Sequence, residues 1–174
     1  MTDGSIYDAD YYERGRQSGK SLYENYRWLR ELTIPMVERM IAHLGIEKHQ
    51  SILDFGCARG YTVKAFRELG YEAYGIDVSQ WAIDNCDEAV KDFVCCTHLV
   101  PPGMDWIIAK DVLEHVPEVS HVIDEMMESV RIGVFVVVPL SLSDHDPYVV
   151  ADYEKDITHL HRLSLATWAR MFMR

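Results

Sequence analysis

Residues 53–60 read LDFGCARG, a glycine-containing turn between a short apolar run, Ser51–Phe55, and a helical pattern over Tyr61–Leu69. A predicted strand that turns into a predicted helix in this way marks the crevice where an open α/β sheet places its ligand. Gly56 lets the backbone come close to such a ligand, and Gly60 leaves the helix start unobstructed, so that N–H groups and the helix dipole face it. The stretch therefore predicts a ligand site at the first strand–helix junction.

An acidic residue, Asp77, lies at the end of the next predicted strand. Glu72–Ile76 reads as a strand, and Asp77 follows it, 23 positions beyond Asp54. A carboxylate in this place can accept both hydroxyl hydrogens of a ribose. Taken separately, the glycines fit a plain tight turn and Asp77 fits a helix cap. Their combination favours a ligand that carries a ribose.

The remainder of the chain continues the alternation of strands and helices. Val134–Val138 is an unbroken β-branched and aromatic run, which is typical of a parallel strand covered on both faces. Ser79 is placed to cap a helix, and Pro35 is expected to divide the first helical stretch into two. The other predicted elements are helices over Ser21–Leu44, Gln80–Val90 and Leu163–Met173, a helix after Pro117, and strands over Phe93–Cys96 and Met104–Ala109. Five strands alternating with helices predict a doubly wound α/β sheet.

Length, charge and cysteine usage exclude several classes of function. At 174 residues the chain has the size of one domain, and we expect a single domain over residues 1–174. The net charge of −11 and the absence of any basic run argue against nucleic acid as a partner. The four cysteines form no CxxC pair, the N-terminus lacks the features of a signal peptide, and the longest apolar stretch, Gly133–Leu140, is too short to span a bilayer. A soluble cytoplasmic protein without a membrane partner is expected.

The glycine spacing distinguishes between two kinds of nucleotide. A dinucleotide fingerprint places glycines where this chain has Ala58 and Tyr61, and a tyrosine side chain would crowd a pyrophosphate. An NAD-dependent oxidoreductase is therefore disfavoured. The Asp-x-Gly-x-x-x-Gly spacing, followed by Tyr74–Ser79 (YGIDVS) and Lys110–Val116 (KDVLEHV), instead resembles the class I, Rossmann-like, S-adenosylmethionine-dependent methyltransferases.

Further segments are similar to one branch of these enzymes. Asp10–Tyr12 near the N-terminus, and Asp156–His159 with the later Trp168, resemble the small-molecule and sugar methyltransferases (type 11/23-like). The resemblance covers about residues 7–174 and implies a mainly parallel Rossmann-like sheet, with a helical lid over residues 1–45 and the core over residues 46–174. It also implies S-adenosylmethionine as the cofactor and a small-molecule or sugar acceptor that is methylated on oxygen.

The resemblance assigns a set of residues to the cofactor. Asp77 is expected to bind the ribose, the turn from Gly56 to Gly60 to pack against the methionine portion, and Tyr12 to close over the sulfonium, which an aromatic face attracts. The residues implied as cofactor-binding are Tyr12, Asp54, Gly56, Cys57, Ala58, Gly60, Asp77, Val78, Lys110, Asp111 and Val112.

Two contacts of the cofactor stay open. Arg16, Lys20 and Arg59 are alternative partners for its carboxylate. Many relatives carry an acid after the third strand, near the adenine, where this chain has Cys95–His98, so the adenine contact is not assigned. The two cysteines of that segment are adjacent on a strand and point to opposite faces, and no fourth ligand is near, so no metal site is predicted.

His159 and His115 are the candidate catalytic residues. The sulfonium is already activated, so the protein mainly supplies position, orientation and exclusion of water. A hydroxyl acceptor must also lose its proton, and histidine titrates in the useful range. The alternative interpretations are a loop histidine anchored by Asp156 or Thr158, and, for His115, a helix-start residue bonded to the backbone.

Relatives continue with two more strands after the helix that contains Trp168, whereas this sequence ends at Arg174. The predicted fold therefore lacks the last two strands, and the apolar edge at Val134–Val138 needs a cover. Three explanations stay open: a further C-terminal piece, a second subunit in a homodimer, or a reduced form that binds cofactor and turns over poorly. The last keeps open an alternative function, a noncatalytic or partner-dependent S-adenosylmethionine-binding subunit.

Overall fold

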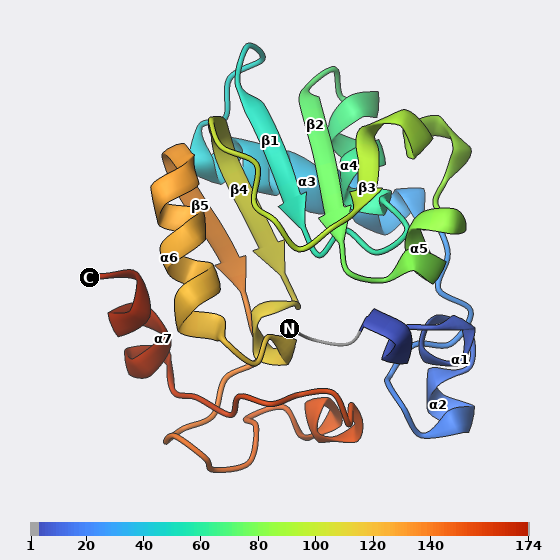
Figure 1. Cartoon of the computed structure of the whole chain (residues 1–174), viewed down its shortest axis with the longest axis vertical. Helices are drawn as coiled ribbons and strands as arrows, with labels where there is room; N and C mark the ends of the chain where they lie inside the picture. Colours follow the sequence, from blue (N-terminus) through green and yellow to red (C-terminus); the bar gives the residue numbers. More distant parts are fainter. Residues whose placement is uncertain (1–3, 174) are drawn as a thin grey trace.

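The strands of the molecule form one parallel sheet. The computed structural model describes residues 4–173. Its strands are β1 Ser51–Phe55, β2 Glu72–Asp77, β3 Val94–Cys96, β4 Met104–Lys110 and β5 Val130–Val137. All pairings are parallel, and the order across the sheet is β3-β2-β1-β4-β5 (Figure 1). The strand order reverses at β1, so the ligand crevice of a doubly wound sheet lies at the carboxyl end of that strand. The predicted α/β class is confirmed.

Helices cover the two faces of the sheet as separate layers. One layer consists of α3 (Arg30–Leu44) and α4 (Tyr61–Glu68), and the other of α6 (Val119–Ser129) and α7 (Leu165–Phe172) (Figure 1). Phe66 is fully buried in the first core, and Ile123 and Trp168 are buried in the second. Each such side chain contributes about 1.5–3 kcal/mol by leaving water. Within residues 4–173, no helix has the length and apolar character needed to cross a membrane.

The first long helix is shorter and more continuous than predicted. Instead of two helices over Ser21–Leu44, α3 begins at Arg30 and runs unbroken through Pro35. The proline removes one backbone donor in the second helical turn, and the buried apolar side of the helix offsets that loss. The residues before α3 are not helical because their backbone bonds to the N-terminal segment. The N–H of Tyr26, for example, donates to the carbonyl of Tyr12 at 3.1 Å.

The predicted helix Gln80–Val90 is two shorter pieces. The α-helix α5 covers Gln80–Asp84, and a 3-10 helix, η2, covers Glu88–Phe93. Ser79 caps α5 as predicted, because its Oγ accepts the N–H of the third helical residue at 2.9 Å. Asp87 caps η2 in the same way. Two successive polar caps therefore turn the chain where the sequence pattern suggested one helix.

The strand β5 differs from its prediction in length and in burial. It begins at Val130 rather than Val134, and most of its residues are half-buried rather than covered on both faces. The reason is its position, since β5 is an edge strand with β4 as its neighbour. The last helix begins at Leu165 because Ser164 caps it. The other predicted strands agree with the structure to within one residue.

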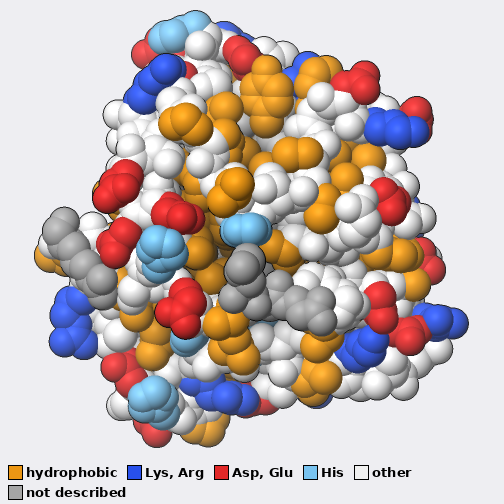
Figure 2. Space-filling model, in the orientation of Figure 1, with side chains coloured by type: hydrophobic (Ala, Val, Ile, Leu, Met, Phe, Trp, Pro, Cys, Tyr) orange, Lys and Arg blue, Asp and Glu red, His pale blue; other side chains and the backbone are white. Residues whose placement is uncertain are grey.

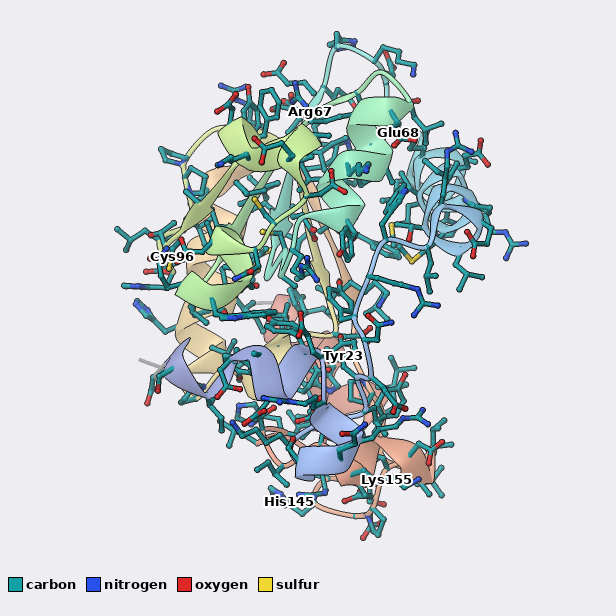
Figure 3. The ribbon with its side chains drawn as sticks, turned by 90° about the vertical axis from the view of Figure 1, so that its right-hand side faces the viewer. Tyr23, Arg67, Glu68, Cys96, His145 and Lys155 are labelled. Carbon is teal, nitrogen blue, oxygen red and sulfur yellow. The ribbon has the colours of Figure 1, made fainter. Side chains whose placement is uncertain are left out.

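An N-terminal segment lies beneath the carboxyl ends of the strands (Figures 1 and 3). Its elements are η1 (Gly4–Ile6), α1 (Ala9–Tyr12) and α2 (Gly15–Ser18), which are short turns of helix rather than a continuous helical lid. The hydroxyl of Ser79 donates to the carbonyl of Tyr7 at 2.5 Å. The hydroxyl of Tyr11 donates to the Asp156 carboxylate at 2.8 Å. The segment is thus tied both to the end of β2 and to the loop that follows β5.

Gly60 and Gly45 share a left-handed backbone but differ in how closely other atoms approach them. Gly60 and Gly45 have φ of +75° and +68°, but a Cβ on Gly60 would lie 2.8 Å from Val90 Cγ2, whereas one on Gly45 meets nothing within 4 Å. We predict that Gly45→Ala costs about 1–2 kcal/mol through left-handed strain alone. Gly60→Ala should cost roughly 1–3 kcal/mol more through overpacking. Urea unfolding of the two variants measures the difference, and equal losses would contradict the prediction.

Candidate functional site

A cavity of about 550 Å³ lies at the carboxyl ends of β1, β2 and β4. This volume falls within the roughly 300–1,000 Å³ typical of small-molecule sites. The N-terminal segment forms its other wall, and Figure 3 shows Tyr23 between that segment and the sheet. On the face drawn in Figure 2, hydrophobic side chains gather over the middle of the molecule, next to histidine and acidic side chains. Ten of the eleven residues predicted to bind the cofactor line the cavity: Tyr12, Asp54, Gly56, Cys57, Ala58, Asp77, Val78, Lys110, Asp111 and Val112.

The eleventh residue, Gly60, has a structural role. It caps α4 with a left-handed backbone and packs against Val90 rather than lining the cavity. Gly56, by contrast, lies at the cavity with φ of +78°, and a Cβ there would lie 2.5 Å from Val112 Cγ2. Glycine is therefore required at Gly56 because two loops meet closely over the end of β1.

The backbone N–H groups of this turn do not face a ligand as the sequence analysis expects. Those of Gly56 and Cys57 donate to the carbonyl of Ile76 at 2.8 and 3.0 Å, and that of Gly60 donates to the Cys57 carbonyl at 2.8 Å. The N–H of Ala58 donates to a side chain of β2 at 2.7 Å. The turn is thus held against β2 by its own donors, and its contribution to the cavity is close approach.

Asp77 is the side chain that receives the Ala58 N–H. Its Oδ2 accepts that bond at 2.7 Å, and its Oδ1 accepts the N–H of Ser79 at 2.8 Å. Burial raises the pKa of Asp77, and the amide donors oppose the shift. Each carboxylate oxygen keeps a further lone pair, and the side chain lines the cavity. Asp77 can therefore accept hydrogen bonds from two neighbouring hydroxyls of a ligand.

A buried acid and a lysine face each other at the ends of β1 and β4. Burial raises the pKa of Asp54 to about 7, while the Lys110 ammonium and the Thr62 hydroxyl oppose the shift. Lys110 also forms an ion pair with Asp111. The carboxylates outnumber the lysine here, so this corner of the cavity suits a ligand group that brings its own positive charge.

Two residues at the cavity hold backbone conformations that glycine would adopt more easily. Ala58, in the turn after β1, has φ of +48°, and Asp111, after β4, has φ of +53°. Such conformations cost about 1–3 kcal/mol each and cluster at functional sites. Both lie in loops over the strand ends, where the cavity opens.

Five tyrosines from the N-terminal segment form the wall opposite the sheet, and we call them the tyrosine cap: Tyr7, Tyr11, Tyr12, Tyr23 and Tyr26. Tyr11 and Tyr12 are buried, and the Tyr12 ring stacks on Trp81 with centroids 5.6 Å apart. Sequence reasoning selected Tyr12 and weighed Tyr11, but it missed Tyr7, Tyr23 and Tyr26. The signal was the density of tyrosine within residues 7–26.

The three basic residues considered for a ligand carboxylate lie outside the cavity lining. Arg16 donates to the carbonyl of Leu22, and Lys20 pairs with Asp8 at 2.8 Å. Arg59 is bonded to two backbone carbonyls and does not line the cavity either. Lys110 is the predicted basic residue that does line it.

The segment after β3 forms a further wall that the sequence analysis left unassigned. Cys96, Thr97, His98 and Leu99 line the cavity beside Asp77. The backbone N–H of Thr97 donates to the Asp77 carbonyl at 2.9 Å, which fixes the segment to the end of β2. The surface it presents combines a thiol, a hydroxyl and an apolar side chain, and its cysteines are free.

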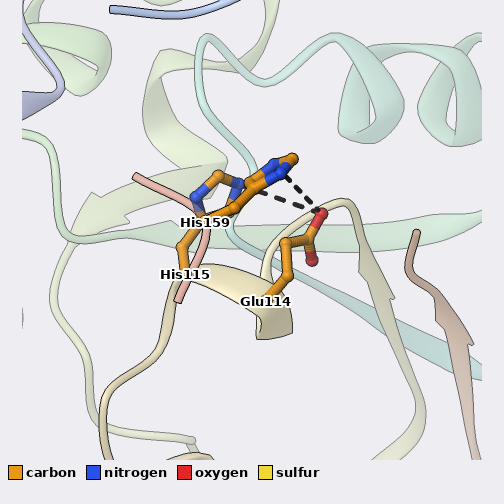
Figure 4. Close-up of side chains that lie close together, drawn as sticks. All are labelled: Glu114, His115 and His159. Carbon is orange, nitrogen blue, oxygen red and sulfur yellow. Dashed lines mark ion pairs between the residues drawn. The ribbon is translucent and has the colours of Figure 1, made fainter. Parts of the chain in front are cut away.

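His115 and His159 come together although 44 positions separate them. Their ring centroids are 4.6 Å apart, and each Nε2 lies 3.9 Å from Oε1 of Glu114 (Figure 4). The backbone explains the meeting, since the carbonyl of Glu114 accepts the N–H of Leu160 at 2.8 Å. His115 lines the cavity, whereas His159 lies behind it. Glu114 was not singled out by the sequence analysis.

A chain of hydrogen bonds orients His115. Its Nδ1 lies 2.8 Å from the hydroxyl of Thr158, and that hydroxyl donates to Asp156 at 2.5 Å. The Thr158 oxygen therefore accepts from His115, which places the proton on Nδ1 and leaves Nε2 with a free lone pair. Asp156 also accepts from Tyr11, so the tyrosine cap and the histidines share one carboxylate.

Burial sets the charge of these groups. It lowers the pKa of His115 to about 4, with a further contribution from His159, and it lowers the pKa of His159 as well. It raises the pKa of Glu114 to about 8. Both imidazoles are therefore neutral at pH 7, and each offers a lone pair to a proton or to an electrophile.

Comparisons with known proteins identify the fold and its family. A family model described as a methyltransferase domain matches residues 26–174. The comparison with curated proteins gives no match. A solved S-adenosylmethionine-dependent methyltransferase from Archaeoglobus fulgidus aligns with a TM-score of 0.65 and 22% identity over 83% of this chain and 67% of that one.

Two further solved structures have the same fold. A complex between the Haloferax volcanii Trm112 methyltransferase activator and a proposed methyltransferase aligns with a TM-score of 0.62 and 17% identity, over 78% of this chain and 65% of that one. Phosphoethanolamine N-methyltransferase 2 of Haemonchus contortus, in complex with S-adenosyl-L-methionine, gives 0.60 and 18%, over 80% and 36%. This chain thus spans about two thirds or less of the length of these structures.

The raised pKa of Asp54 makes stability depend on pH. The folded state favours the protonated carboxyl, so its stabilising contribution is present below the ordinary pKa of 3.8 and is lost as pH rises towards about 7. We predict that Asp54→Asn gains relative to the parent by up to about 1.4 kcal/mol per pH unit across that window. Unfolding by urea at a series of pH values measures this. The exposed Asp92 gives the control variant, Asp92→Asn. A flat difference for Asp54→Asn would contradict the assignment.

Proposed function

We propose, from the premise that this chain belongs to the methyltransferase domain family, that it transfers a methyl group to a hydroxyl oxygen of a small-molecule or sugar acceptor. S-adenosylmethionine is the cofactor, and it supplies a methyl group already activated as a sulfonium. The observation that carries the proposal is the meeting, at one cavity, of the Asp77 carboxylate, an aromatic wall and the neutral His115, whose ring lies against that of His159. The first two suit the cofactor, and the third suits an acceptor hydroxyl.

The residues of the cavity fit the parts of the cofactor by their chemistry. Asp77 has free lone pairs for the two ribose hydroxyls, and the segment Cys96–Leu99 beside it supplies a surface for the adenine. Lys110 is the cationic partner for the carboxylate of the methionine portion. Asp54 and the tyrosine cap favour positive charge, so they suit the amino group and the sulfonium.

The protein contributes to the transfer by positioning the reactants, excluding water and accepting the proton that the acceptor hydroxyl loses. The tyrosine cap closes the cavity with three buried rings and two half-buried ones, which removes water from the acceptor and orients it. His115 and His159 keep the role expected for them, which is to act on the acceptor hydroxyl. His115 stands at the cavity wall, and the bonded Thr158 hydroxyl directs its Nε2 lone pair away from Asp156.

The second candidate function is that of a partner-dependent or noncatalytic S-adenosylmethionine-binding subunit. It is motivated by the Haloferax volcanii structure, in which a proposed methyltransferase is solved together with an activator protein. The same cavity would then bind cofactor, and turnover would require a second protein. A reconstitution assay separates the two functions, because an independent enzyme turns over without added protein.

We also propose that a second copy of the chain covers the outer edge of β5. β5 has a strand neighbour on one side, and Ile132 on it is 51% exposed. An apolar, unpaired strand edge is a template for pairing with another chain. Light scattering tests the homodimer: a monomeric mass at micromolar concentration would exclude it.

The experiment that tests the proposed function first is calorimetric titration with S-adenosylmethionine and S-adenosylhomocysteine. Binding of both to the folded protein, followed by methyl transfer to a hydroxylated acceptor in a screen, would support it. A folded protein that binds neither would refute it. Binding without turnover, restored by a partner protein, would favour the second function.

The ribose site gives a prediction for Asp77. Asp77→Asn removes the charge from the carboxylate that would accept the ribose hydroxyls, at a cost of about 1.5–3 kcal/mol for charged hydrogen bonds. We expect cofactor affinity to fall by roughly tenfold or more. Asp84→Asn, at an exposed acid one helix away, should bind like the parent. Unchanged affinity in Asp77→Asn would show that the ribose lies elsewhere.

The histidine pair gives a prediction on turnover. His159→Ala should lower the rate of methyl transfer by about 10²–10⁴-fold, as removal of proton-transfer groups does. Because His159 does not line the cavity, cofactor binding should stay at the parent value. The matched control is His49→Ala, at an exposed histidine remote from the cavity. A variant that loses cofactor binding together with turnover would place His159 in the cofactor site instead.

A further inference from the structure

Glu114 is a fully buried acid without a bonding partner. It has no exposed surface, and neither Oε1 nor Oε2 has a hydrogen-bond partner within the described part of the chain. An unpartnered buried carboxylate costs several kcal/mol if it is charged, so such a group is normally paired or bound to a metal. Its Oε1 lies 3.9 Å from Nε2 of His115 and 3.9 Å from Nε2 of His159, which is too far for a hydrogen bond.

Both imidazoles lie beside this carboxyl group, and His115 turns an Nε2 lone pair towards it. Thr158 accepts the Nδ1 proton of His115, so the Nε2 that approaches Glu114 is unprotonated. The side chain of His159 is 5% exposed, and its Nδ1 has no partner within residues 4–173. Three side chains that can each offer a ligand atom thus converge without a hydrogen bond between the carboxyl group and either ring.

We propose that Glu114, His115 and His159 bind a divalent first-row transition-metal cation. One ligand atom from each of the three lies within 4.8 Å of the others. Metal–ligand bonds of about 2.0–2.2 Å place neighbouring ligand atoms roughly 3.0–3.5 Å apart. The side chains therefore need to close by up to about 1–2 Å around the ion.

The donor set selects the class of cation. Two imidazole nitrogens and one carboxylate oxygen suit Zn²⁺, Mn²⁺, Fe²⁺ or Co²⁺, whereas Mg²⁺ and Ca²⁺ prefer oxygen ligands. The cation would also bond to the buried carboxylate, for which no hydrogen-bond partner exists in the described part of the chain. Three protein ligands leave further coordination positions free, as in sites that act on a substrate.

The surroundings of His115 resemble those of a metal ligand. A metal-bound histidine normally donates its other ring N–H to a carboxylate, a carbonyl or a similar acceptor, which fixes its tautomer. Here Nδ1 donates to Thr158, and Thr158 donates to Asp156. Asp156 also accepts from Tyr11, so the second layer of the site is joined to the tyrosine cap.

The position of the site would allow a bound cation to act on an acceptor in the cavity. His115 lines the cavity, so an acceptor oxygen can reach a free coordination position beside it. A bound cation lowers the pKa of such a hydroxyl and thus eases loss of its proton. This consequence rests on the proposed function, whereas binding of the cation does not.

The test is direct metal binding, measured apart from activity. Protein freed of metal by chelation is titrated with Mn²⁺, for which the exposed thiols of Cys95 and Cys96 have little preference, and bound Mn²⁺ is followed by electron paramagnetic resonance. We expect one ion per chain. Co²⁺ should give visible absorption bands of the same stoichiometry.

Variants assign the ligands. Glu114→Gln and His159→Ala should lose affinity for Mn²⁺ by at least about 100-fold. Thr158→Val removes the hydroxyl that accepts the Nδ1 proton of His115, and it should lower the affinity by about 10–100-fold. Glu114→Gln keeps the size of the side chain and cannot ionise, so we expect it to fold at least as well as the parent. His49→Ala, at an exposed histidine, should bind like the parent.

The outcomes separate the metal site from the proposed function. Stoichiometric binding that Glu114→Gln and His159→Ala abolish supports the site. A folded parent that binds no metal, or a Glu114→Gln variant that binds as well as the parent, overturns it and leaves Glu114 as a protonated buried acid. Titration of the metal-free protein with S-adenosylmethionine reports on the cofactor cavity independently, so either idea can fail alone.

Discussion

The carboxylate of Asp77 is the group on which the arrangement of the site depends. It accepts one N–H from the turn after β1 and one from the residue that caps α5, so it joins two loops that leave neighbouring strands. Ser79 then extends the connection, because its hydroxyl donates to the carbonyl of Tyr7. One buried acid thereby places the glycine turn, the start of α5 and the tyrosine cap around the same cavity. Its burial is tolerable because charged hydrogen bonds to amides offset the lost hydration.

Asp156 organises the opposite side of the cavity in a similar way. It accepts the hydroxyls of Tyr11 and Thr158 and the backbone N–H of Thr158. These bonds hold the loop after β5 against the N-terminal segment and set the tautomer of His115. The two anchoring acids differ in what they hold: Asp77 accepts backbone N–H groups, whereas Asp156 accepts two side-chain hydroxyls as well as one backbone N–H. The polar groups on this side of the cavity are therefore oriented by hydrogen bonds within the chain.

Glu114 stands apart from these two acids because nothing in the described chain bonds to its carboxylate. Satisfied acids build the cavity, and an unsatisfied one lies at its edge between two imidazoles. Native proteins rarely bury such a group without a use for it. Asp77 and Asp156 use their oxygens to hold the structure together, whereas the oxygens of Glu114 have no such bonds within residues 4–173 and are free to bind an ion.

The sequence alone determined the sheet, the position of the cavity and the part of its lining that comes from the ends of β1, β2 and β4, since strand periodicity, glycine spacing and Asp77 are local features whose meaning follows from chain geometry. Pro35 and the segment after α5 departed from the prediction because packing and caps from distant residues overrode local propensity. Only the tertiary structure decided that the amides of Gly56, Cys57 and Ala58 are bonded to β2 and that the Arg59 side chain bonds to backbone carbonyls outside the cavity lining. It alone also brought His159 beside Glu114, because contacts between residues so far apart in the chain arise from the closing of a loop, which no local pattern records.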